Sequence, residues 1–162
     1  ALAADPSAFS GAVVFDPSAA LDQPWTGPDR RLLTEMRAAV AAGRLSRAMT
    51  IFSRVVGLPG WQGAVVGALT ALTPRYRPLV RCQVDDLEAM EVLGDRLSTY
   101  AAIATRTILL VGERSPARLV EVVAAIAAAM PNAERVTMPG RDHGADLKAP
   151  RDVAAVIRRL TP

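Results

Sequence analysis

Residues 107–112, Thr107-Ile108-Leu109-Leu110-Val111-Gly112, decide the fold class, because their apolar run is continuous and does not alternate with polar residues. Such a run is typical of a strand that helices cover on both faces of a parallel sheet. Apolar residues at helical spacing follow from Pro116 to Met130 and again from Pro150 to Leu160. Both segments begin with proline, and Ser115 is the predicted N-cap of the first. This order of strands and helices predicts an α/β fold.

Two other segments have the composition of strands. Gly11 to Phe15 is a short apolar run that ends at Asp16-Pro17, and we expect it to be buried on both faces. Arg135 to Met138 is a weaker candidate, closed by Pro139-Gly140. With residues 107–111, these segments predict three strands of one parallel sheet.

About ninety residues separate the first two predicted strands, far more than one crossover helix requires. We therefore assign residues 18–104 to a helical subdomain, and residues 1–17 and 105–162 to the α/β core. Gly43 and Gly57 are predicted to end the first two helices of the insertion. Helical periodicity occurs in four segments of it: 29–42, 45–56, 61–72 and 78–93.

Composition excludes several classes of protein. Apolar residues make up 51% of the chain, which excludes disorder. The net charge is +3, but the arginines are scattered and interleaved with acids, so no nucleic-acid partner is expected. No apolar run is long enough to cross a bilayer, and no membrane partner is expected. Cys82 is the only cysteine, which excludes an intrachain disulfide. A lone cysteine indicates a reducing, cytoplasmic location. We expect the thiol of Cys82 to be buried or half-buried.

The only histidine lies in the loop Pro139-Gly140-Arg141-Asp142-His143-Gly144, between the third strand and the last helix. A neutral imidazole there can accept a proton from a hydroxyl group if a carboxylate fixes its tautomer. The alternative interpretation is an ordinary surface histidine. No G-x-S-x-G turn, which would hold a serine nucleophile, occurs in the sequence.

Three blocks occur in an order that resembles the second half of a lid-bearing α/β-hydrolase. They are residues 11–17, residues 107–116, and the histidine loop with Ala149-Pro150 after it. The resemblance covers nearly all of the chain and implies the C-terminal part of a doubly wound parallel sheet, with 18–104 as its helical lid. It also implies a serine hydrolase acting on an ester, lactone or related acyl substrate, with His143 as the catalytic histidine.

The resemblance implies a Ser-His-Asp triad and offers two positions for its acid. The family usually places it in the turn after the penultimate strand, where this chain has Ser115. Some members carry it at the end of the earlier strand, where Asp16 stands, and we choose Asp16. A turn or capping residue is the alternative interpretation of Asp16, and Glu113 is the alternative acid. Asp142 is expected to be solvated.

The resemblance places the nucleophile upstream of Ala1, so we expect an N-terminal fragment of the same hydrolase as a partner and no activity from this chain alone. A non-catalytic subunit or binding module of the same fold stays open, as does a cyclase or dehalogenase on this scaffold. No cofactor motif and no metal-ligand set occurs in the sequence. The resemblance implies that lid aromatic residues roof the substrate, although core packing is the favoured interpretation: Trp25, Phe52, Trp61 and Tyr76.

Overall fold

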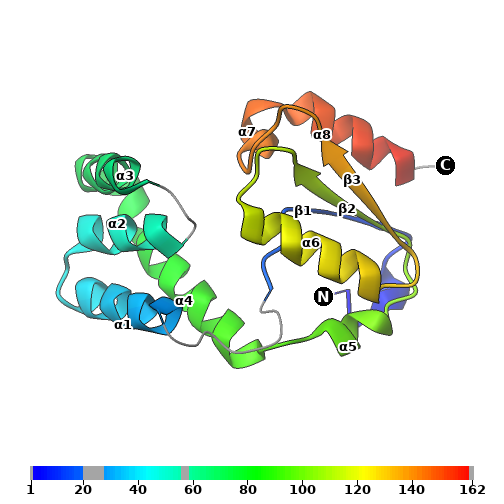
Figure 1. Ribbon diagram of the computed structural model, residues 1–162, viewed down its shortest axis with the longest axis horizontal. Helices are drawn as coiled ribbons and strands as arrows, with labels where there is room; N and C mark the ends of the chain where they lie inside the picture. Colours follow the sequence, from blue (N-terminus) through cyan, green and yellow to red (C-terminus); the bar gives the residue numbers. More distant parts are fainter. Residues whose placement is uncertain (1, 20–27, 56–58, 161–162) are drawn as a thin grey trace. The chain divides into compact units, whose positions relative to one another are not determined.

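A computed structural model describes residues 2–19, 28–55 and 59–160 of the chain. The chain divides into two compact units, Ala1–Leu21 together with Asp95–Pro162, and Asp22–Gly94 (Figure 1). The helical unit is shorter than the predicted 18–104, because residues 18–21 and 95–104 belong to the unit that contains the sheet. That the helical unit serves as a lid stays a prediction.

The first unit contains a sheet of three parallel strands, β1 (Ala12–Phe15), β2 (Thr107–Gly112) and β3 (Ala133–Met138), in the order β1-β2-β3. β2 is the central strand, and its Leu109 lies opposite Val14 of β1. All six residues of β2 are buried. The predicted α/β fold with a parallel sheet is confirmed.

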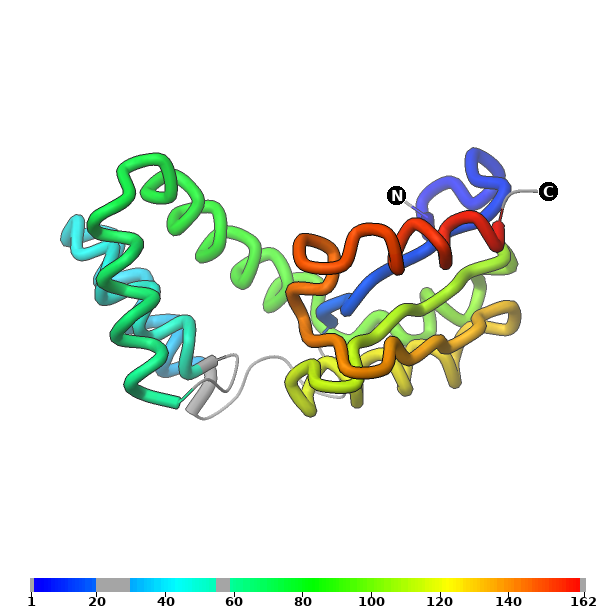
Figure 2. Tube along the Cα trace, turned by 90° about the horizontal axis from the view of Figure 1, so that it is seen from above, coloured from blue at the N-terminus to red at the C-terminus, as the bar shows by residue number. Residues whose placement is uncertain are grey.

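Helices cover both faces of this sheet, which explains why its central strand has no polar face. On one face, Leu109 and Val111 lie in a buried cluster with α6 (Ala117–Ala129). On the other face, Leu110 packs with residues of α8 (Pro150–Ile157). Figure 2 shows the strands between α6, in yellow, and α8, in red.

Two local expectations in this unit are wrong. The residues of β1 are only half-buried, because no described strand pairs with the second edge of β1. Ser115 does not cap α6: the N-cap is Pro116, which makes no side-chain hydrogen bond. The Ser115 hydroxyl bonds to Asp16 instead.

Short elements complete the unit: η1 (Pro6–Ala8), α5 (Leu97–Ala101), α7 (Ala145–Lys148) and η3 (Arg158–Leu160).

The second unit contains α1 (Pro28–Ala41), α2 (Leu45–Val55), α3 (Gly60–Leu72) and α4 (Arg77–Leu93), with the short η2 (Pro74–Tyr76) before α4. These helices match the four predicted segments. Gly43 ends α1 with a φ of +69°, as predicted, whereas Gly57 lies outside the described residues. Cys82 of α4 is exposed, contrary to expectation, because α4 packs through other residues. The buried core of the unit contains Leu33, Met36, Ala39, Ala48, Ile51, Val80, Val84 and Leu87.

Helices α2 and α3 approach each other closely through small residues. A Cβ atom at Gly67 would lie 2.6 Å from the carbonyl oxygen of Ser46 and would also meet the Thr50 hydroxyl. A Cβ atom at Gly63 would lie 3.1 Å from the Cβ of Ser53. The hydroxyl groups of Thr50 and Ser53 bond to carbonyl oxygens of their own helix, so they need no partner from α3. The glycines therefore set the distance between the two helices.

We predict that Gly67→Ala destabilises the protein by about 1–3 kcal/mol, because the added methyl group must displace backbone as well as a side chain. Gly60→Ala is the matched control, since a Cβ atom at Gly60 meets nothing within 4 Å. The control should be neutral or slightly stabilising. Urea unfolding of both variants measures the difference; equal stabilities would contradict the tight helix contact.

Candidate active site

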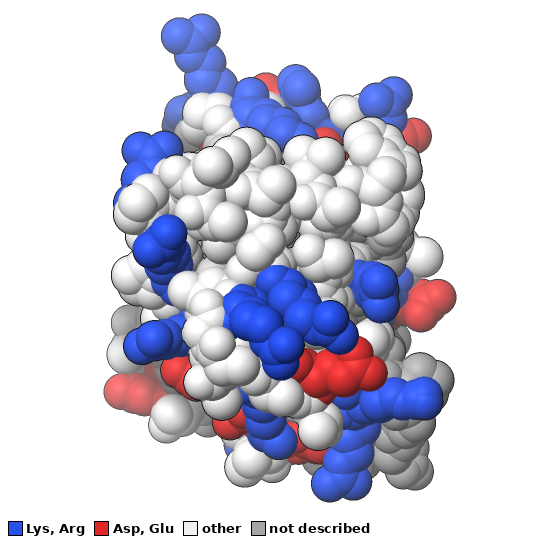
Figure 3. Space-filling view, turned by 90° about the vertical axis from the view of Figure 1, so that its left-hand side faces the viewer, with Lys and Arg blue, Asp and Glu red and all other residues white. Residues whose placement is uncertain are grey.

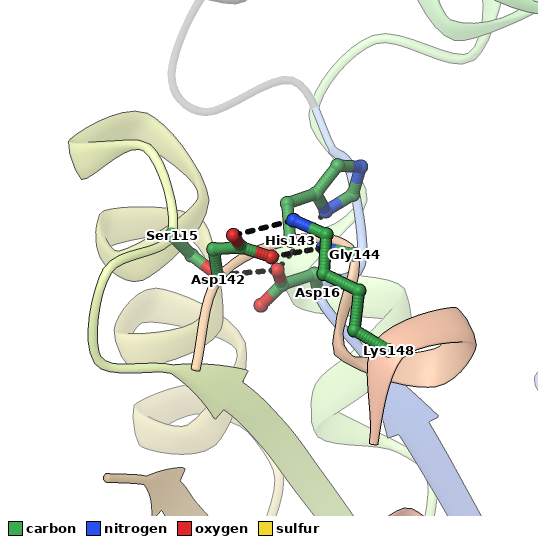
Figure 4. A network of polar contacts seen from close by, with 6 residues as sticks. All are labelled: Asp16, Ser115, Asp142, His143, Gly144 and Lys148. Carbon is green, nitrogen blue, oxygen red and sulfur yellow. Dashed lines mark hydrogen bonds and ion pairs between the residues drawn. The ribbon is translucent and has the colours of Figure 1, made fainter. Parts of the chain in front are cut away.

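The candidate site lies at the carboxyl edge of the sheet, where parallel strands end side by side. Asp16 follows β1, Ser115 lies in the turn after β2, and His143 lies in the loop after β3 (Figure 4). Ser115 and His143 are 99 and 127 positions from Asp16 in the sequence, yet both contact its carboxylate. The parallel sheet is what brings them together.

The carboxylate of Asp16 and the imidazole of His143 form a direct contact. Nδ1 of His143 lies 3.0 Å from Oδ2 of Asp16. The Asp16 side chain is fully buried, whereas the His143 side chain is 61% exposed. The ring of Phe15 stacks on the imidazole with 6.3 Å between ring centroids. One ring nitrogen is thus held by an acid, and Nε2 has no hydrogen-bond partner among the described residues.

Ser115 holds the acid in place. Its buried hydroxyl donates a 2.6 Å hydrogen bond to Oδ2 of Asp16, the same oxygen that faces His143. Gly112 permits this arrangement, because a Cβ atom there would lie 2.7 Å from both the Ser115 hydroxyl and the carbonyl oxygen of Arg141. Sequence reasoning recognised that Ser115 occupies the usual acid position but missed its contact with Asp16.

The backbone of Asp16 has an unusual conformation. Its φ is +41°, and no other described non-glycine residue has a positive φ. Asp tolerates this region better than most residues, and such outliers concentrate at functional sites. Its amide group still donates a 2.8 Å hydrogen bond to Leu110 of β2, so the turn begins directly at the end of the strand pairing. The second carboxylate oxygen, Oδ1, is buried and has no partner in the described part of the chain.

Glu113, the alternative acid, lies elsewhere. Its Oε2 accepts a hydrogen bond of 2.5 Å from the amide of Gly140, at the start of the histidine loop. Arg141 in the same loop pairs with Asp152 of α8 at 2.6 Å. These contacts hold the loop against β2 and α8, and the structure brings Asp16 rather than Glu113 to His143.

A further pair braces the loop beside the histidine. Oδ1 of Asp142 accepts a hydrogen bond from the Gly144 amide at 2.9 Å, and Oδ2 lies 2.7 Å from Nζ of Lys148 (Figure 4). The hydrogen bond from Lys148, followed by that from Gly144, lowers the pKa of Asp142. Asp142 is therefore paired as well as partly solvated. Sequence reasoning missed Lys148, although it is the only lysine in the chain.

The environment of His143 favours its charged form. Its hydrogen bond to Asp16 raises the pKa of His143 above the ordinary 6.5, and this effect exceeds the lowering caused by partial burial. Because the folded-state pKa is raised, the pair stabilises the fold below about pH 6.5, and that contribution is lost as pH rises through the folded-state pKa. The neutral imidazole, the form that can act as a base, is populated above the same pKa.

The aromatic residues assigned to the substrate have different surroundings. Phe52 packs partly buried against the core of the helical unit. Trp61 is 69% exposed and Tyr76 is 41% exposed, so core packing is wrong for Trp61. The side of α3 that packs inward consists of small residues, which leaves no room there for an indole ring. Trp25 lies outside the described residues, and substrate contact by the others stays a prediction.

Two kinds of feature are absent from the described ranges 2–19, 28–55 and 59–160. They contain no group of three His, Cys, Asp or Glu residues placed to hold a metal ion. They also contain no helix with both the length and the apolar character needed to cross a membrane.

Comparison with solved structures identifies the fold. An α/β hydrolase from Sphaerobacter thermophilus is 26% identical, with a TM-score of 0.70 over 99% of this chain. The chain has part of the α/β-hydrolase fold. A 2-hydroxy-6-oxo-6-phenylhexa-2,4-dienoate hydrolase from Rhodococcus sp. strain RHA1 is 14% identical, with a TM-score of 0.59 over 98% of the chain. An esterase from Thermogutta terrifontis is 17% identical, with a TM-score of 0.50 over 93%.

The α/β-hydrolase resemblance inferred from the sequence is thereby confirmed at the level of fold. The chain spans 61%, 57% and 54% of the length of these three structures. No protein-family profile and no curated protein matches the chain. At these identities the shared fold does not determine the reaction, which depends on the residues of the site.

We predict that Asp16→Asn lowers the pKa of His143, because it removes the negative charge that stabilises the imidazolium. NMR titration of the single histidine of the sequence measures this shift directly. Glu113→Gln is the matched control, since Glu113 bonds to Gly140 and Gln retains an acceptor oxygen for that bond. A His143 pKa that moves with Glu113→Gln and not with Asp16→Asn would contradict the observed contact.

Proposed function

We propose that Asp16 and His143 are the acid and the base of a Ser-His-Asp triad in a hydrolase of ester, lactone or related acyl compounds. The observation that carries the proposal is the 3.0 Å contact between a buried carboxylate and an exposed imidazole. A carboxylate on Nδ1 selects the tautomer in which Nε2 is unprotonated. That nitrogen is then available to a hydroxyl group outside the chain.

The reaction follows from these positions. Nε2 of His143 takes the proton of a serine hydroxyl as its oxygen attacks the acyl carbon, and Asp16 stabilises the imidazolium that forms. His143 then returns the proton to the leaving alcohol, which gives an acyl-enzyme that water hydrolyses by the same steps. Ser115 and the Asp142–Lys148 pair keep the acid and the loop in position.

The nucleophile is supplied by polypeptide that this sequence does not include. The sequence contains no G-x-S-x-G turn, and the chain spans 61% of the Sphaerobacter hydrolase. Among the described residues, Oδ1 of Asp16 is buried without a partner and one edge of β1 has no paired strand, which supports further protein packing at this edge. The proposal therefore includes an N-terminal part of the same hydrolase as partner, and no turnover by these 162 residues alone.

We predict that, in the complete protein, His143→Ala and Asp16→Asn each lower kcat/KM for a p-nitrophenyl ester by about 10³–10⁴. Removal of the base stops proton transfer, and removal of the acid stabilises the wrong tautomer. Glu113→Gln should change kcat/KM less than about threefold. Because the pKa of His143 is raised, the rate of the unmodified protein should fall with decreasing pH from a point above 6.5.

Other outcomes would redirect or end the proposal. Hydrolysis that survives His143→Ala ends the triad assignment, and loss with Glu113→Gln but not Asp16→Asn moves the acid. An aspartate in place of serine at the upstream nucleophile turn would favour a dehalogenase, which is a separate reaction on the same fold.

We also predict that Ser115→Ala in the complete protein lowers kcat by about tenfold with little change in KM, since a hydrogen bond to a buried charge contributes about 1.5–3 kcal/mol. Ser10→Ala, at an exposed serine, is the matched control. Steady-state kinetics on the same ester separates the two constants. Unchanged kcat in Ser115→Ala would show that Asp16 keeps its position without this bond.

A further inference from the structure

Helix α3 of the second unit packs inward through small residues and exposes its large apolar ones. An ordinary surface helix has the reverse arrangement. It contains no charged residue. Its inward residues are small, namely Gly63, Gly67 and Thr70. Its outward residues are large and apolar, namely Trp61, Val65, Leu69 and Leu72, which are 50–79% exposed. A helix that only covers a core has the reverse arrangement, so the outward side requires a separate explanation.

The apolar surface extends past the end of α3. Tyr76 and Leu79 are also exposed, and with Leu69 they border a hollow of about 360 Å³ whose other walls include Met49, Val66 and Val80. We call Trp61, Val65, Leu69, Leu72, Tyr76 and Leu79 the apolar face. It is formed entirely by α3, η2 and the first turn of α4.

The charge pattern of this region differs from that of the rest of the chain. Between Glu35 and Asp85 the sequence contains no acidic residue, so the interleaving of arginines with acids expected from the whole sequence fails here. Arg37 pairs with Glu88 of α4. The other arginines of this stretch have no carboxylate partner among the described residues: Arg44, Arg47, Arg54, Arg75, Arg77 and Arg81.

Three of these arginines line one hollow beside the apolar face. Arg44, Arg47 and Arg77 lie around a hollow of about 650 Å³ between the start of α2 and the end of α3. Arg77 donates a 3.2 Å hydrogen bond to the carbonyl oxygen of Ala71, the neighbour of Leu72 in α3. In the view of Figure 3, broad uncharged areas, in white, are bordered by Lys and Arg, in blue, with Asp and Glu, in red, beside some of them.

We propose that the apolar face docks on an anionic phospholipid bilayer. Its apolar side chains enter the boundary between headgroups and acyl chains, and Arg44, Arg47 and Arg77 contact lipid phosphates. Surfaces that lie in a membrane interface combine Trp and aliphatic residues with a border of arginine, and each basic residue near an anionic leaflet adds attraction. This departs from the sequence expectation of no membrane partner, which concerned segments that cross the bilayer. It does not depend on the proposed triad, and it gives Trp61 and Tyr76 a lipid contact in place of the substrate contact that the resemblance implies.

Charge favours a bilayer over a second copy of the chain. In a symmetric dimer through this face, the unpaired arginines of one copy would meet those of the other, and like charges would oppose association. An anionic lipid surface provides the opposite charge and also an apolar interior.

The test is flotation of the complete protein with phosphatidylcholine vesicles, with and without phosphatidylglycerol. We expect binding only with phosphatidylglycerol, and weaker binding at higher ionic strength. Leu72→Glu should reduce the partition coefficient about tenfold or more. Arg47→Gln should reduce it about fivefold. Both residues are exposed, so the variants should fold.

Two matched variants separate the face from the rest of the unit. Val92→Glu places a charge on an apolar residue near the far end of α4 that is 88% exposed, against 79% for Leu72. Arg31→Gln removes a positive charge from α1, which also carries Glu35. Both should bind vesicles as the unmodified protein does. No flotation, equal flotation on both vesicle types, or equal loss in the controls overturns the proposal. The proposal is also overturned if light scattering shows that Leu72→Glu dissociates a dimer while flotation is unchanged. The same holds if Leu72→Glu lowers ester hydrolysis without affecting flotation.

Discussion

The position of β2 between two parallel neighbours is the constraint on which the rest of the site depends. Its residues are buried on both faces, so helices must pack above and below it, and the chain must cross over between strands. All three strands then end at one edge. That edge receives the turn with Asp16, the turn with Ser115 and the loop with His143, whose contacts no local segment of the chain could form.

The contrast in burial between Asp16 and His143 gives this edge its chemical character. The acid is enclosed, held by Ser115, and carried on a backbone turn with positive φ, so its carboxylate has little freedom to move. The imidazole is anchored at one nitrogen and exposed elsewhere. The loop that carries it is tied through Glu113, Arg141 and Asp142 to three different parts of the unit. An imidazole that is held at one nitrogen and accessible elsewhere is what the proposed proton transfer to an external group requires.

The helical unit is governed by a different constraint, the close contact of α2 and α3 through glycines. Because small residues occupy the inner side of α3, its large apolar residues have no place in the core and lie outward. The same packing that stabilises the bundle therefore creates the surface that we assign to a lipid interface. The absence of acids from this part of the sequence matches that assignment, since acids would oppose binding to anionic lipid.

Periodicity and composition were sufficient for the order of strands and helices, because continuous apolar runs, helical stripes and glycine ends are local signals. The candidate histidine could be predicted because it is the only one, and Asp16 because the resemblance places an acid at the end of that strand. The role of Ser115, the pairing of Lys148 and the outward position of Trp61 could not be predicted, nor could the partial exposure of β1. Each depends on which residues from distant segments meet, and only the packing of the folded chain decides that.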